Sequence, residues 1–136
     1  MPIRIWIDKD QRLIRSEISG SFSEEDILNA INESVAHPGY EPGFNVLSDH
    51  TRVTEFITTP QAYSMARHLE SLSEQMANVR WAVVTREPAS NGMMRVMSVL
   101  VERVPMEVQI FETIEEAEEW LGSSPRTVLV NSKGPP

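Results

Sequence analysis

Hydrophobic and polar residues alternate along the chain with two periods, one near two residues and one near 3.6 residues. Isoleucines at positions 3, 5 and 7, which alternate with Arg4, Trp6 and Asp8, predict a strand over residues 3–7. After a polar turn at residues 9–11, the alternation predicts a second strand over residues 12–19. The short connection between the two strands favours an antiparallel hairpin.

Two helices are predicted downstream of this hairpin from their capping residues and apolar stripes. Ser23 and Asp26 resemble a capping box, and the apolar stripe that follows runs to about residue 36. Thr59 followed by Pro60 predicts an N-cap and the first helical residue. Proline is tolerated at that position because the backbone N–H that it lacks would have no partner within the helix. The second helix is expected to run through about residue 75.

Two more helices are predicted in the second half of the chain. Ser90 is expected to cap a helix over residues 91–103. Thr113 with Glu116 is a full capping-box pattern for the last helix, which Gly122 ends.

Three further strands lie between the predicted helices, at residues 44–49, 79–85 and 106–110. The second of them is apolar on both faces, as an interior strand should be. Residues 50–58 are expected to be polar and irregular. The order β-β-α-β-α-β-α-β-α predicts an α/β fold with a mixed, mostly parallel sheet of about five strands.

The domain organisation follows from the length of 136 residues, which suits one α/β domain. We assign that domain to residues 1–122 and a C-terminal tail to residues 123–136. Within the tail, only residues 127–130 have the pattern of a short strand.

Composition excludes several functions. The 12 Lys and Arg residues face 20 Asp and Glu residues, and this net charge of −8 argues against nucleic acid as a partner. The absence of cysteine removes disulfides and thiol chemistry. No apolar run approaches the roughly 18 residues that span a bilayer, so stable membrane insertion is not expected. No signal-peptide pattern opens the chain, which makes the cytoplasm the expected location.

The motifs of common enzyme classes are missing. The sequence contains no GxGxxG, P-loop, GxSxG or HExxH pattern, and its three histidines follow no metal-binding spacing. We therefore expect no cofactor, no metal and no catalytic residues.

Ser48-Asp49-His50 holds the residue types of a catalytic triad, but on a strand Ser48 and His50 share one side while Asp49 points to the other. Asp49 lies at the carboxyl end of a predicted parallel strand, where open α/β sheets place their ligands. It either caps the loop, pairs with Arg52 or takes part in a site. A small hydrolase using Asp49 and His50 is the weaker alternative function.

Methionines cluster on two predicted helices, at Met65 and Met76 and at Met93, Met94 and Met97. Methionine packs cores and also suits pliable apolar surfaces. Core packing is one interpretation, and an apolar groove or dimer face is the other. Because Met93 and Met94 are adjacent, one of them is expected near the surface.

Several segments together carry a family resemblance. They are Ile18-Ser19-Gly20-Ser21-Phe22-Ser23 ahead of a helix with Glu25-Asp26, the strands Val46-Leu47-Ser48-Asp49 and Trp81-Ala82-Val83-Val84, and Val108-Gln109-Ile110-Phe111 followed by Glu115-Glu116-Ala117-Glu118-Glu119-Trp120-Leu121. In these segments the chain resembles the SpoIIAA-like group, which includes STAS (sulfate transporter and anti-sigma-factor antagonist) and Sec14-like domains. The resemblance spans about residues 3–121.

This resemblance implies a regulatory protein–protein module or a lipid holder. Anti-sigma-factor antagonists are phosphorylated on a serine within an Asp-Ser-Ser-Gly-like sequence, but here His50-Thr51-Arg52 follows Asp49 and the nearest hydroxyls are Thr58 and Thr59. Sec14-like relatives hold lipids in an apolar cavity.

We therefore expect a non-enzymatic, cytosolic STAS-like module that binds a protein partner or a small apolar ligand. A structural homodimer, with Trp6 and Trp81 or the methionine helix at its interface, is the main alternative. The candidate binding residues are Asp49, His50, Thr51, Arg52, Thr58, Thr59, Met93, Met94 and Met97.

Overall fold

The computed structural model describes residues 2–122, except for the side chains of residues 88 and 89, so the strand expected at residues 127–130 lies outside the described part. The sheet has five strands in the order β1-β2-β3-β4-β5. They are β1 (Ile3–Asp8), β2 (Leu13–Gly20), β3 (Asn45–Val53), β4 (Arg80–Val84) and β5 (Glu107–Phe111). The first pair is antiparallel and the other three are parallel.

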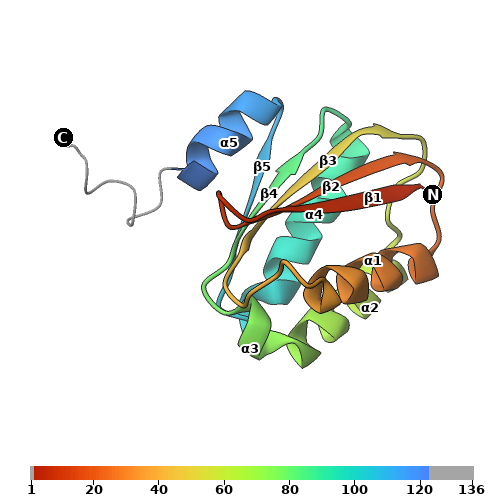
Figure 1. Cartoon of the computed structure of the whole chain (residues 1–136). Helices are drawn as coiled ribbons and strands as arrows, with labels where there is room; N and C mark the ends of the chain where they lie inside the picture. Colours follow the sequence, from red (N-terminus) through yellow and green to blue (C-terminus); the bar gives the residue numbers. More distant parts are fainter. Residues whose placement is uncertain (1, 123–136) are drawn as a thin grey trace.

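The helices cover the two faces of the sheet unequally. They are α1 (Glu24–Ala36), α2 (Thr59–Ser71), α3 (Ser73–Met76), α4 (Pro88–Leu100), the 3₁₀ turn η1 (Val101–Arg103) and α5 (Ile114–Gly122). Figure 1 shows α1, α2 and α4 on one face and α5 on the other. Right-handed crossovers between neighbouring parallel strands place α1, α2 and α4 on the same side. The predicted mixed α/β fold is confirmed.

Two apolar clusters form the core, one on each face. The larger one lies under α1, α2 and α4 and includes Met65, Val83, Met97 and Val101. The smaller one lies under α5 and consists of Leu13, Leu47, Ala82, Val84, Ala117 and Leu121. Helix α5 packs mainly on β3, β4 and β5 and reaches β2 through Leu13 and the Arg15–Glu118 ion pair (2.8 Å). Trp6 of β1 and the far end of β2 therefore lie on a part of this face that α5 leaves open (Figure 1).

Strand β3 is longer than the sequence predicts, because residues 50–53 belong to it rather than to an irregular segment. Glu17 pairs with Asp49 and Ser19 pairs with Arg52, so one residue of β2 faces two residues of β3. This is a β-bulge with the extra residue at His50 or Thr51. The bulge interrupts the period-two alternation, which is why the sequence pattern stops indicating a strand there.

The starts of two helices also differ from the prediction. Thr58, not Thr59, is the N-cap of α2, and Gln61 completes its capping box from both sides. Helix α4 begins at Pro88, ahead of Ser90, and the side chain of its N-cap residue Glu87 forms no capping hydrogen bond with the described residues. A proline fits the first turn of a helix without loss of a hydrogen bond, so Pro88 can start α4 on its own.

The two predicted helices 60–75 and 91–103 are each divided in the structure. The first divides into α2 and α3 near Leu72, whose backbone N–H bonds to Leu69 and Glu70 carbonyls. The second ends at Leu100 and tightens into the 3₁₀ turn η1. The stripe residues Met97 and Val101 are buried as the pattern predicts.

Replacement of the N-cap of α2 tests the revised helix start. Thr58→Ala should lower the free energy of unfolding by about 1 kcal/mol, because the Gln61 backbone N–H loses its acceptor. Thr59→Ala, at the neighbouring exposed position, should cost less than about 0.5 kcal/mol. Urea denaturation of both variants decides the matter, and a larger loss for Thr59→Ala would contradict this assignment.

Candidate functional site

Strand β3 sends alternate side chains to the two faces of the sheet. Ser48 and His50 share one side of the strand, as predicted. That side faces α1, α2 and α4, and both residues are buried there. The Ser48 Oγ accepts hydrogen bonds from the Ser16 hydroxyl on β2 (2.9 Å) and from the Trp81 Nε1 on β4 (3.0 Å). Three neighbouring strands therefore place polar atoms at one point of an otherwise apolar face.

A cavity of about 110 Å³ lies between this face of the sheet and helices α1 and α2. Its floor comes from β1, β2, β3 and β4, and its roof comes from α1 and α2. Its apolar wall includes Ile3, Ile5, Ile14, Ile18, Ile27, Ile31, Val46, Met65, Leu69, Met76 and Met106. Its polar lining within the interior comes from Ser16, Ser34, Ser48, His50 and Ser90, with the Trp81 ring among them.

His50 is the most unusual group in the wall. Its residue is only 5% exposed, and no described residue forms a hydrogen bond with its imidazole. Burial lowers the pKa of His50 to about 4, and the neighbouring Asp49 carboxylate opposes this only in part. His50 is therefore a neutral imidazole near pH 7, with one donor and one acceptor nitrogen.

The cavity reaches the surface beside the segment between β3 and α2. Glu55 and Phe56 in this segment line the cavity and are exposed. A Glu55 carboxylate oxygen accepts a hydrogen bond from the Phe22 backbone N–H (3.3 Å), which joins this segment to the start of α1. The opening thus lies at the carboxyl ends of β2 and β3, where parallel α/β sheets commonly bind ligands.

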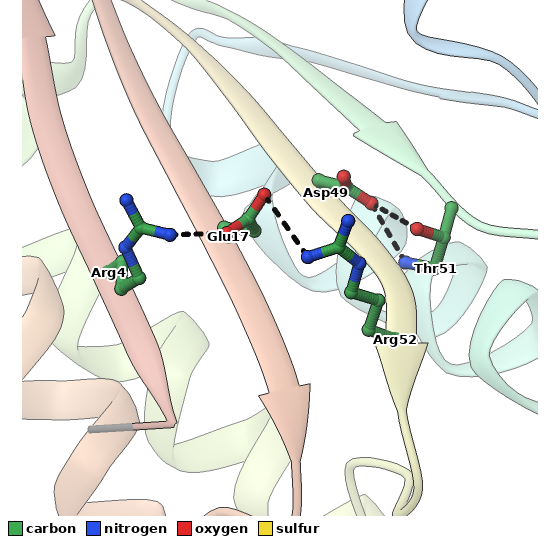
Figure 2. A network of polar contacts seen from close by, with 5 residues as sticks. All are labelled: Arg4, Glu17, Asp49, Thr51 and Arg52. Carbon is green, nitrogen blue, oxygen red and sulfur yellow. Dashed lines mark hydrogen bonds and ion pairs between the residues drawn. The ribbon is translucent and has the colours of Figure 1, made fainter.

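Asp49 lies on the opposite face, and it does not pair with Arg52. Its Oδ1 accepts hydrogen bonds from the backbone N–H (2.9 Å) and the hydroxyl (2.7 Å) of Thr51, as Figure 2 shows. The bulge takes the extra residue out of the regular ladder, so this carboxylate supplies an acceptor for the Thr51 N–H. Asp49 thereby supports the bulge next to His50.

Arg52 belongs to a second group on the same open face. The Glu17 carboxylate lies between Arg4 (3.1 Å) and Arg52 (3.9 Å), also shown in Figure 2. Exposed ion pairs of this kind contribute only about 0–1 kcal/mol each. The group therefore matters more for the charge pattern of this face than for stability.

The predicted hydrolase residues do not form a relay. The side chains of His50 and Asp49 lie on opposite faces of β3, and within residues 2–122 the imidazole bonds to neither Asp49 nor Ser48. A nucleophile, base and acid must be in contact in series for this chemistry. The described residues also contain no cluster of three or more histidines and carboxylates that could hold a metal ion.

The methionines of α4 lie in the core rather than in the cavity wall. Met94 and Met97 are fully buried, while Met93 is partly buried against the core. Met65, Met76 and Met106 line the cavity instead. Sequence reasoning missed Ser16, and it placed Trp81 at a dimer interface rather than in the cavity wall. The signal for Ser16 and Ser48 is a polar residue on the inward side of an apolar strand.

The remaining candidates are the two threonines before α2. The Thr58 hydroxyl oxygen accepts from Gln61 as the N-cap, and Thr59 is the first helical residue. Both are exposed and neither lines the cavity. No helix within residues 2–122 is both long enough and apolar enough to cross a bilayer.

The buried imidazole should make stability depend on pH. Its folded pKa of about 4 lies below the usual value near 6.5, so the unfolded chain binds the extra proton first. The free energy of unfolding should therefore fall as the pH drops from about 6.5 to 4, by about 3 kcal/mol from this group. Urea denaturation at a series of pH values measures it.

His50→Gln should remove the part of the pH dependence of the unfolding free energy that comes from the buried imidazole. His37→Gln, at an exposed position, should leave that part unchanged. The test compares the slope with pH rather than the absolute stability, because carboxylates titrate in every variant. An unchanged slope in His50→Gln would show that the imidazole is not buried in its neutral form.

Comparisons with known proteins agree with this fold. The SpoIIAA-like family model matches residues 13–122, while no curated protein matches. A similar solved structure is an uncharacterised protein of the DUF3478 family with a SpoIIAA-like fold from Shewanella loihica PV-4. It shares 20% identity over 88% of this chain and 93% of that chain, with a TM-score of 0.61. With its family model matched across most of its length and a mixed five-stranded sheet in its fold, the chain belongs to the SpoIIAA-like family.

Proposed function

We propose that this domain is a non-enzymatic binding module that holds a small apolar ligand between the sheet and helices α1 and α2. The cavity is the observation that carries the proposal, because apolar side chains from the sheet and from the helices above it surround a space that none of them fills. Ligand sites in proteins are typically concave and mostly apolar, with a few polar groups that fix orientation.

Energetics support an apolar occupant. Unfilled apolar space costs about 24 cal/mol per Å³ in core variants of proteins. For a cavity of about 110 Å³, a well-fitting occupant would regain on the order of 3 kcal/mol from contacts that the wall now lacks.

A non-enzymatic role is favoured over hydrolysis. The imidazole of His50, the one titratable group within the interior of the cavity, forms no hydrogen bond with a carboxylate or hydroxyl of the described residues. Near pH 7 a base with a pKa of about 4 takes up protons poorly. The same residues are well suited to orienting a ligand.

A protein partner is the second candidate function, and the open face of β1 and β2 favours it. Trp6 is 42% exposed there, with the Arg4 guanidinium 5.6 Å from its ring centre. Exposed tryptophan and arginine are the side chains enriched at binding hot spots. Of the two tryptophans expected at a homodimer interface, only Trp6 is accessible to a second copy. Trp81 is 8% exposed and faces the cavity.

Filling the cavity tests the ligand proposal. Toluene should bind to the parent protein and shift the amide resonances of residues along the wall. Ala30→Leu adds bulk to the wall from α1, so it should weaken toluene binding about tenfold, equivalent to about 1.4 kcal/mol of lost contacts. NMR titration of ¹⁵N-labelled protein gives both affinities.

Ala36→Leu is the matched control, because it makes the same change on an exposed residue of the same helix outside the cavity. It should leave toluene affinity unchanged. Equal weakening in both variants, or no toluene binding to the parent, would contradict the proposal.

The second candidate predicts that a protein partner depends on Trp6. Trp6→Ser should abolish most cross-linking of the partner in lysate of the host, measured by mass spectrometry, without changing toluene binding. Val99→Ser is the control, because Val99 is 62% exposed on α4 and lies on the other side of the sheet. If both variants cross-link as well as the parent, the open face is not the docking surface.

A further inference from the structure

The interior of the cavity contains hydrogen-bonding groups that the protein itself leaves unused. Buried polar side chains are nearly always hydrogen-bonded, so each exception calls for an explanation. The imidazole of His50 is such an exception among residues 2–122, since it lines the cavity without a partner. The hydroxyl of Ser90, also buried in the wall, is a second one.

Ser48 adds a third unused group. Its oxygen accepts from both Ser16 and Trp81, which leaves the Ser48 hydroxyl hydrogen without an acceptor among the described residues. Because Ser48 and His50 point to the same face of β3, their free donor and acceptor positions are neighbours. Together they can bond one polar group that enters the cavity.

Charge limits what that polar group can be. Apart from His50, Glu55 is the only ionisable residue in the wall among the residues that the structure describes, and it lies at the opening and already accepts from Phe22. No lysine or arginine within the described part of the chain lines the cavity to neutralise an anion, and Asp49 on the other side of β3 would repel one. A buried charge without a counter-ion is strongly disfavoured.

We infer that the cavity selects a small apolar molecule with one uncharged hydroxyl or carbonyl group, which His50 and Ser48 hold by hydrogen bonds. The inference rests on the proposed function and names the chemical class of its ligand. An apolar cavity of about 150 Å³ is known to hold benzene, so one of about 110 Å³ suits a single ring or a short chain.

A series of ligands with one ring and different polar groups tests this selection. The probes are toluene, benzyl alcohol, benzoate and benzylammonium, each titrated into ¹⁵N-labelled protein at pH 7.5. Benzyl alcohol should bind about tenfold more tightly than toluene, because it satisfies buried groups that toluene leaves unpaired. Both ions should bind more weakly than toluene, and the Trp81 indole resonance should respond to the alcohol.

Replacement of His50 identifies the group responsible. His50→Leu should abolish the advantage of benzyl alcohol while toluene still binds, and His37→Leu, at an exposed position, should preserve it. If His50→Leu does not fold, the order of the four probes on the parent protein still decides the question.

The outcomes separate the two levels of the proposal. Failure of toluene and benzyl alcohol to bind the parent overturns the proposed function together with this inference. Equal affinities for the two overturn only the selection of a hydroxyl group. If benzoate or benzylammonium binds most tightly, the selection of an uncharged group is overturned and the cavity prefers a charged ligand.

Discussion

The alternation of side chains along strand β3 is the constraint on which the rest of this structure depends. β3 lies at the centre of the sheet and pairs in parallel with β2 and β4. Its pleat must send Ser48 and His50 toward α1 and α2 and Asp49 toward the open face. β3 thus divides its polar side chains between the two faces of the sheet, with Ser48 and neutral His50 toward the cavity and Asp49 and Arg52 on the outer face.

The fold followed closely from the sequence because its main signals are local. Alternating isoleucines gave β1, and a run that is apolar on both faces gave β4. The Thr113–Glu116 pattern marked the start of α5, where the Glu116 backbone N–H donates to the Thr113 hydroxyl and that hydroxyl donates to the Glu116 carboxylate. Errors arose where two local signals competed. Thr58 and Thr59 both suit an N-cap, and only the reciprocal contact with Gln61 decides between them.

The candidate site was less accessible to sequence reasoning, because a cavity is defined by what neighbouring side chains fail to fill. Residue types placed Ser48, Asp49 and His50 on their correct faces. They could not show that a cavity lies between the sheet and helices α1 and α2. Nor could they show that Met65 and Met76 line this cavity while Met94 and Met97 are buried elsewhere in the core. Such packing depends on contacts between residues far apart in the chain.

The bulge in β3 decides the chemical character of the cavity. Because one extra residue lies at His50 or Thr51, the alternation restarts with Val53 facing inward and Arg52 on the outer face beside Glu17. In a regular strand the same sequence would place the Arg52 guanidinium inside and Val53 outside. A single backbone irregularity, supported by the Asp49 carboxylate, therefore keeps a permanent positive charge out of the binding space and leaves neutral His50 as its principal polar group.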